Sequence, residues 1–273
     1  GITRAFQMPA QQALTPLLVP QELLPGAIAL SSSGVQAAII GGPALGGVLY
    51  VAGATTVYVC GAVLLLAAGA LTMTVRYQHR PASTAATWRA VFAGVSFVWY
   101  RKLLLGAISL DLFAVLLGGA TALLPIYARD ILHTGPAGLG LLRSAPAVGA
   151  LTMSLALTRW PLQRRVGHRL LAAVGLFGVA TIVFGLSTRF ELSLIALAIT
   201  GAADSISVVT RQTLMQLETP DEMRGRVAAV NSIFIGASNQ LGEFESGATA
   251  TLFGPVGSVV LGGIGTLLVA IGW

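Results

Sequence analysis

Four acidic residues lie inside long apolar segments of the sequence: Asp111, Asp204, Glu243 and Glu245. On insertion scales, an acid at the centre of a membrane-spanning helix costs about 2.5–3.5 kcal/mol, so it is seldom kept without a role. A carboxyl group in such a place can bind and release a proton, or it can pair with a cation. These residues are therefore the first candidates for a proton or substrate site.

Asp111 lies on a helical face that small residues continue at spacings of three or four. These residues are Ala114, Gly118, Ala122 and Pro125. A carboxylate on such a face suits a proton or cation site where two halves of a bundle meet. The alternative is a structural acid that hydrogen bonds hold near the end of its helix, and both hypotheses stay open.

A second polar stripe lies in the apolar run 227–252. Ser232, Gly236, Asn239 and Glu243 follow one another at spacings of three or four, so they share one helical face. Glu245 points to the opposite side. We therefore expect Asn239 and Glu243 to face a cavity, and Glu245 to pair with a neighbouring helix.

Two arginines lie in, or at the mouth of, apolar runs. Arg4 stands 200 residues before Asp204, which is the period of an internal repeat described below, so one hypothesis pairs the two charges across the repeat. Arg143 begins another run. It either contacts an anionic cargo or extends its guanidinium group to the membrane surface.

No pattern indicates a metal or catalytic centre. His79, His133 and His168 fall between the central parts of the apolar runs, without the spacing of metal ligands. The chain has no GxxxxGK loop for nucleotide phosphates. We predict no metal, no cofactor and no catalytic residue, and hence a protein that is not an enzyme.

Long apolar helices must position these charges. The chain is 55% hydrophobic and 10% charged, with a mean hydropathy of +0.82, which is far above that of soluble domains. Its apolar runs have the length that a helix needs to cross a bilayer, and no alternation of period two is present. The sequence predicts an all-α membrane protein with nine spans near residues 1–15, 25–49, 55–75, 104–128, 141–158, 170–187, 192–210, 227–252 and 256–273.

The net charge of +6 does not indicate a nucleic-acid partner, because the basic residues are placed by topology. Twelve of the sixteen lie in the alternate connections 76–102, 159–169 and 211–226, whereas the opposite connections hold only Arg129 and Arg189. By the positive-inside rule, the three basic connections are cytoplasmic.

An internal repeat organises the spans. A shift of 200 residues matches eleven of the first 47 positions. The informative matches are polar, and Thr219, Pro220 and Glu222 of the second copy have the pattern of a capped helix start. The matched pairs include Gln12 with Gln212, Pro20 with Pro220, Glu22 with Glu222, and Gly42 with Gly242.

The repeat predicts two parallel six-helix halves. Three spans precede the second copy after the basic connection, but none precedes the first, so we expect three helices to be missing before residue 1. The chain opens and closes inside apolar runs, as if cut at both ends. The expected units are 1–75 for the last three helices of the first half, 76–102 for a cytoplasmic central loop, and 103–273 for the second half.

The segment 42–47, with Gly42, Pro43, Gly46 and Gly47, resembles the GPxxGG antiporter motif of the major facilitator superfamily. Small residues let neighbouring helices approach closely, and generic tight packing is the alternative interpretation. The expected facing surface is the small-residue face of 141–158, with Ser144, Ala145, Pro146, Ala147, Gly149, Ala150 and Ser154. The segments 110–115, 122–125, 140–150 and 238–247 are similar to the branch that includes bacterial enterobactin exporters.

The connection after 141–158 resembles a worn copy of the DRxGRR gating loop of that superfamily. It contains Arg164, Arg165, Gly167 and Arg169, with an arginine where the loop's acid would stand. The alternative is that these arginines only anchor the connection on the cytoplasmic side.

The resemblance implies a major facilitator fold, with about nine of twelve transmembrane helices present in this chain. It implies a monomer in the bacterial inner membrane that exports a siderophore or drug-like molecule by proton antiport and alternating access. The alternatives are a proton-coupled importer, a non-transporting membrane fragment, and a membrane enzyme or scaffold. The last lacks support, because clustered catalytic residues and long soluble loops are missing from the sequence.

Overall fold

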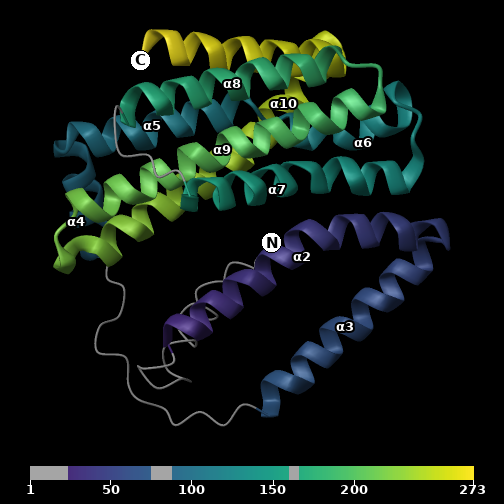
Figure 1. The fold of residues 1–273 in the computed structure, drawn as a ribbon, viewed down its shortest axis with the longest axis horizontal. Coiled ribbons are helices and arrows are strands. Elements are labelled where there is room, and N and C mark those ends of the chain that lie inside the picture. The colour runs from purple at the N-terminus through teal and green to yellow at the C-terminus, as the bar shows by residue number, and fades with distance from the viewer. Residues whose placement is uncertain (1–23, 75–87, 160–165) are drawn as a thin grey trace.

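A computed structural model describes residues 24–74, 88–159 and 166–273, and every regular element in these ranges is helical (Figure 1). The predicted all-α fold is thereby confirmed for this part of the chain. The elements are α2 (Leu24–Val51), α3 (Ala54–Thr74), α4 (Trp88–Tyr100), α5 (Lys102–Leu117), η1 (Ala120–Leu123), α6 (Leu124–Ile126), η2 (Tyr127–Ile131), α7 (Gly135–Arg159), α8 (Val166–Leu186), α9 (Phe190–Glu218) and α10 (Asp221–Gly272).

Within the described ranges, six helical stretches are long and apolar enough to cross a membrane. The last of them belongs to α10, whose 52 residues are interrupted at Gly254. Gly254 has a φ of +73°, which favours glycine, and Pro255 has no backbone N–H to continue the ladder. The break therefore divides α10 into two spans, as the runs 227–252 and 256–273 predicted. The predicted run 1–15 lies outside the described residues.

Two predicted connections are partly helical. The segment 76–102 contains α4, and α9 extends past position 210 into the segment 211–226. Packing explains the extra helix, because Val98 of α4 is buried against Val227 and Val230 of α10. Burial of an amphipathic face stabilises a short helix that would be marginal alone.

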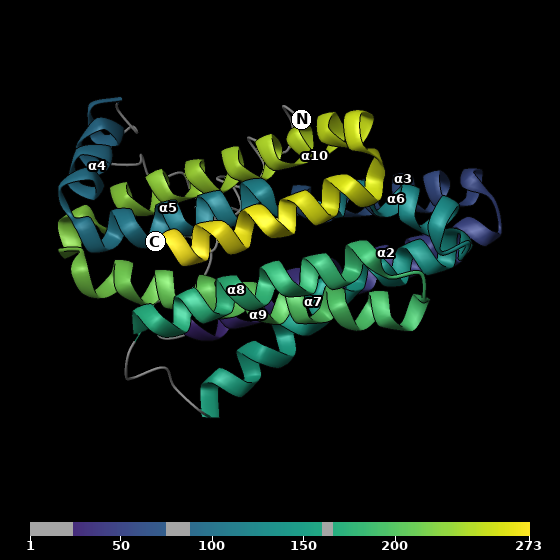
Figure 2. The same ribbon diagram turned by 90° about the horizontal axis from the view of Figure 1, so that it is seen from above.

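Five helices form one bundle, and α2 and α3 lie beside it. α5, α7, α8, α9 and α10 run alongside one another, whereas α2 packs on α7 and α3 contacts α2 (Figures 1 and 2). α4 crosses the end of the bundle at which α5 begins (Figure 2). The side chains of Leu64, Leu65 and Leu66 on α3 are exposed, which agrees with a position in lipid.

The contact between α7 and α9 brings two backbones together. A methyl group added to Gly149 of α7 would overlap the backbone of Ala198, and one added to Gly201 of α9 would overlap the backbone of Pro146. Nearby, the hydroxyl groups of Ser154 and Ser205 are 2.8 Å apart and share a hydrogen bond. Small residues and a polar contact are the means by which helices associate in lipid.

Gly201→Ala is expected to lower the free energy of unfolding by about 1–3 kcal/mol, because the added methyl group forces α7 and α9 apart. Gly175→Ala is the matched control, since the space beside Gly175 of α8 is open. Thermal unfolding of the purified variants in detergent measures the difference. Equal midpoints for the two variants would contradict the close approach.

Candidate functional site

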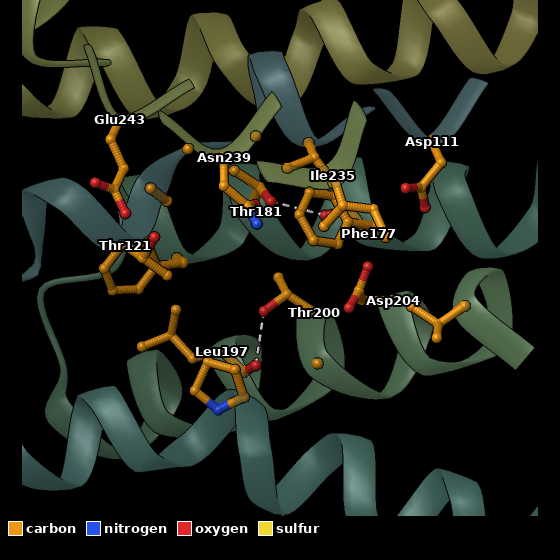
Figure 3. A pocket seen from close by; sticks show the side chains of 18 of the residues that line it. Asp111, Thr121, Phe177, Thr181, Leu197, Thr200, Asp204, Ile235, Asn239 and Glu243 are labelled. Atoms are coloured by element: carbon orange, nitrogen blue, oxygen red, sulfur yellow. Dashed lines mark hydrogen bonds between the residues drawn. The ribbon is translucent and has the colours of Figure 1, made fainter. Parts of the chain in front are cut away.

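A cavity of about 310 Å³ lies inside the bundle (Figure 3). Its walls come mainly from α5, α8, α9 and α10, with η1 at one side. Four of the predicted site residues line it together, namely Asp111, Asp204, Asn239 and Glu243. We call this space the carboxylate cavity. Glu243 lies toward one end of it and Asp111 toward the other, with Asp204 on the side of Asp111 (Figure 3).

An interruption after α5 contributes to the cavity wall. The sequence predicted one continuous helix over 104–128, but α5 ends at Leu117 and is followed by η1, α6 and the π-helical η2. At the break, a Cβ atom on Gly119 would lie 2.6 Å from the carbonyl oxygen of Gly242 in α10. Only glycine permits this approach. Irregular backbone at membrane depth is tolerated where it lines a cavity, as Thr121 does here.

A buried ion pair joins α5 to α9 at the carboxylate cavity. Arg211 donates from Nη1 to Oδ2 of Asp111, and the two side chains are only 3% and 10% exposed. The prediction that Arg211 lies in the connection 211–226 is wrong, because α9 continues to Glu218. Spacing could have revealed the position of Arg211 on this helix, because Arg211 follows Asp204 by seven residues, which is two turns along one helical face.

Two acids in the same cavity have no counter-charge in the part of the chain that the structure describes. Asp204 and Glu243 form no hydrogen bond or ion pair with any described residue, while Arg211 is already paired with Asp111. Asp204 also shares a small recess with Asp111 and Phe177. The cavity therefore combines one neutralised pair with two carboxyl groups that can bind and release protons.

The polar stripe of α10 reaches the cavity only in part. Asn239 and Glu243 line it, together with Ile235, whereas Ser232 lies outside its lining. Glu245 does not line the cavity either, and it forms no ion pair with a described residue. The expected pairing of Glu245 with a neighbouring helix is therefore absent from the described part of the chain.

The segment that resembles the antiporter motif lies against α7. A Cβ atom on Gly47 would be 3.1 Å from Cα of Gly140, and one on Gly140 would be 2.5 Å from the carbonyl oxygen of Pro43. Ser144 adds a hydrogen bond from its hydroxyl group to the carbonyl oxygen of Ile40, at 2.7 Å. The expected facing surface is thus divided. Ser144 contacts α2, whereas Pro146, Gly149 and Ser154 contact α9.

A second cavity, of about 740 Å³, lies between α2, α7 and the segment of α6 and η2, with Val57 of α3 at one side. Gly46 and Arg143 line it, so Arg143 is not part of the carboxylate cavity. We call this space the arginine cavity. A Cβ atom added to Gly42 would have no other heavy atom within 4 Å, so the space beside Gly42 is open.

Some predicted residues contribute to neither cavity or cannot be placed. Arg4, Arg164 and Arg165 lie outside the described residues, so the proposed pair of Arg4 with Asp204 stays a hypothesis. Gly167 and Arg169 lie in the first turns of α8 and are exposed. Within the described ranges, no group of three His, Cys, Asp or Glu side chains is arranged to hold a metal ion.

Asp111→Asn is expected to lower the free energy of unfolding by about 3–5 kcal/mol, because it leaves the Arg211 guanidinium group buried without a partner. Glu243→Gln, which breaks no described contact, should change it little. The double variant Asp111→Asn/Arg211→Gln should recover part of the loss. Chemical denaturation of the wild type, the Asp111→Asn, Arg211→Gln and Glu243→Gln variants and the double variant measures this. Strictly additive effects of Asp111→Asn and Arg211→Gln would contradict a functioning ion pair.

Comparisons with known proteins identify the family of the chain. The sequence pattern of the Major Facilitator Superfamily matches residues 1–243. The chain is 28% identical over 281 residues to the enterobactin exporter EntS of Citrobacter koseri, and 26% identical over 280 residues to proteins of the same name in Shigella boydii and Escherichia coli O1:K1. Each match covers 99% of this chain and 65% of the relative's length. The chain therefore belongs to the major facilitator superfamily, a family of transporters and not of enzymes, and it is part of a multi-pass membrane protein.

Proposed function

We propose that the protein is a secondary active exporter that moves a small molecule outward in exchange for protons, by alternating access. Membership of the superfamily and similarity to proteins named enterobactin exporters support transport and its direction. A position in the bacterial inner membrane and a monomeric state belong to the same proposal.

The observation that carries the proton part is the pair of acids without counter-charge. Asp111 serves as the fixed partner of Arg211, so Asp204 and Glu243 are the residues assigned to proton exchange. Each proton that binds removes one negative charge from the carboxylate cavity. Because an isolated charge in a low-dielectric space is costly, the protonation state changes which conformation of the protein is favoured.

The lining of the carboxylate cavity suits a small polar molecule with an aromatic part. Asn239 and Gln212 supply amide groups, and Phe177 supplies a ring. The hydroxyl groups of Thr181 and Thr200 are engaged by the carbonyl oxygens of their own helices, so they have less to offer a cargo. A catechol siderophore or a drug-like compound has the required mixture of polar and aromatic groups.

The contact of α2 with α7 is the place at which the two halves meet in this proposal. α2 belongs to the expected unit 1–75 and α7 to the expected unit 103–273. Backbones that touch through Gly47 and Gly140 can tilt against each other without long side chains in the way. Export against import rests on the resemblance of the segment 42–47 to an antiporter motif.

Asp204→Asn or Glu243→Gln is expected to remove most of the proton-driven export, because the amide cannot take up a proton. Glu191→Gln is the matched control, since Glu191 lies in the first turn of α9, is exposed, and lines neither cavity. Export of a fluorescent drug or a catechol siderophore from expressing cells measures the effect, with membrane levels compared by immunoblot.

Two results would contradict the proposal. If both variants export like the wild type, the carboxyl groups do not couple protons to transport. If vesicles of known orientation accumulate the compound in the direction of uptake, the protein is an importer, although the fold is unchanged.

A further inference from the structure

The arginine cavity differs from the carboxylate cavity in its charge. None of the residues described along its walls is acidic, and most are apolar or small. They come from α2, α3, α6 and α7, and include Pro43, Gly47, Val57, Pro125, Pro136 and Leu139. A cavity of about 740 Å³ with such walls is large enough for a small molecule.

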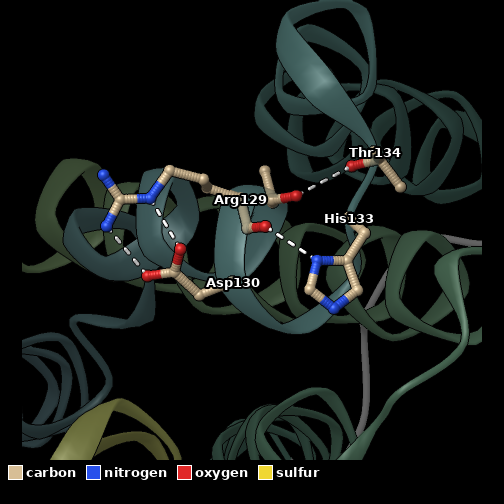
Figure 4. Close-up of polar contacts among 5 residues, drawn as sticks. Arg129, Asp130, His133 and Thr134 are labelled. Carbon is tan, nitrogen blue, oxygen red and sulfur yellow. Dashed lines mark hydrogen bonds and ion pairs between the residues drawn. The ribbon is translucent and has the colours of Figure 1, made fainter.

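Of the basic residues in this cavity, Arg129 and His133 are already engaged (Figure 4). Arg129 donates from Nε and Nη2 to both carboxylate oxygens of Asp130, at 2.6 and 3.0 Å, so its charge is compensated. His133 donates from Nδ1 to the carbonyl oxygen of Arg129, at 3.0 Å. In the neutral ring, its other nitrogen therefore has no proton to offer an anion.

Arg143 is the cation that remains. It forms no hydrogen bond or ion pair with any described residue. Its position, eight residues after Gly135, lies about 12 Å along α7, inside an apolar span. A guanidinium group at that depth needs an anion or water as a partner. Arg143 follows Gly140 by three residues, so it lies on the face of α7 that contacts α2. This face also lines the arginine cavity.

We propose that the arginine cavity is a second binding site for the cargo, in which Arg143 holds an anionic group attached to an aromatic ring, such as an aromatic carboxylate. The guanidinium group supplies paired donors for a carboxylate, and the Tyr50 hydroxyl group lies in the same lining as a further donor. Tyr50 and the apolar walls accommodate the ring. This inference rests on the proposed function, because it identifies the chemical class of the cargo.

The test is binding of 2,3-dihydroxybenzoate and of its uncharged methyl ester to the purified protein in lipid nanodiscs, by isothermal titration calorimetry. The wild type should bind the acid more tightly than the ester. Arg143→Gln should weaken binding of the acid by about tenfold or more, as expected for a lost charge-assisted hydrogen bond, and leave the ester unchanged. Arg143→Lys should keep part of the preference.

Arg189→Gln is the matched control, since Arg189 is an exposed arginine at the start of α9 that lines neither cavity. Absence of acid binding to the wild type, or an acid-to-ester preference that survives Arg143→Gln, would overturn the inference. So would an effect of Arg143→Gln seen only in nanodiscs with phosphatidylglycerol, because a lipid headgroup would then occupy the site. Loss of export in the Asp204 and Glu243 variants is independent of these results, so the proposed function can stand or fail separately.

Discussion

The buried ion pair between Asp111 and Arg211 determines what the other charges of the bundle can do. Inside a membrane, a charge must be paired, solvated or neutralised by a proton, because the surroundings supply no compensating dipoles. Asp111 forms an ion pair with Arg211, the cation that lines the carboxylate cavity. Asp204 and Glu243 have no such partner among the described residues, and this is why the proposed function assigns proton exchange to them. The same pair also fixes α5 against α9, on two sides of the cavity.

Glycine contacts hold α7 against both of its neighbours. α7 and α9 touch backbone to backbone at two glycines and share a hydrogen bond between serines. α2 and α7 also touch at two glycines, Gly47 and Gly140, and Ser144 bonds to Ile40, but the arginine cavity adjoins this second contact. Close packing makes relative motion costly, and a cavity beside a contact makes it cheaper. In the proposed function, the boundary between α2 and α7 is therefore where one part moves against the other.

The sequence predicted the spans well, because the length and apolarity of each run depend on the bilayer and not on tertiary contacts. The cavity positions of Asn239 and Glu243 followed from helical spacing alone, whereas Asp204 was a candidate only as an acid inside an apolar run. The pairing of Asp111 with Arg211 was not predicted, because the count of charges assigned Arg211 to a connection. Only packing extends α9 far enough to bury Arg211. The break after α5 was missed for a similar reason. Gly118 and Gly119 are ordinary in a membrane helix, and their effect depends on α8 and α10, which lie far along the chain.

The two cavities have complementary electrostatic properties, and this constrains which of them suits an anionic cargo when the acids are ionised. When Asp204 and Glu243 are ionised, the carboxylate cavity repels an anion, whereas Arg143 attracts one. Protonation of those acids removes the repulsion without changing the arginine cavity. While those acids are ionised, an anionic cargo is therefore favoured at Arg143 over the carboxylate cavity. Pro146 of α7 also touches the carboxylate cavity, and Arg143 of the same helix lines the arginine cavity, so a shift of α7 reaches both sites.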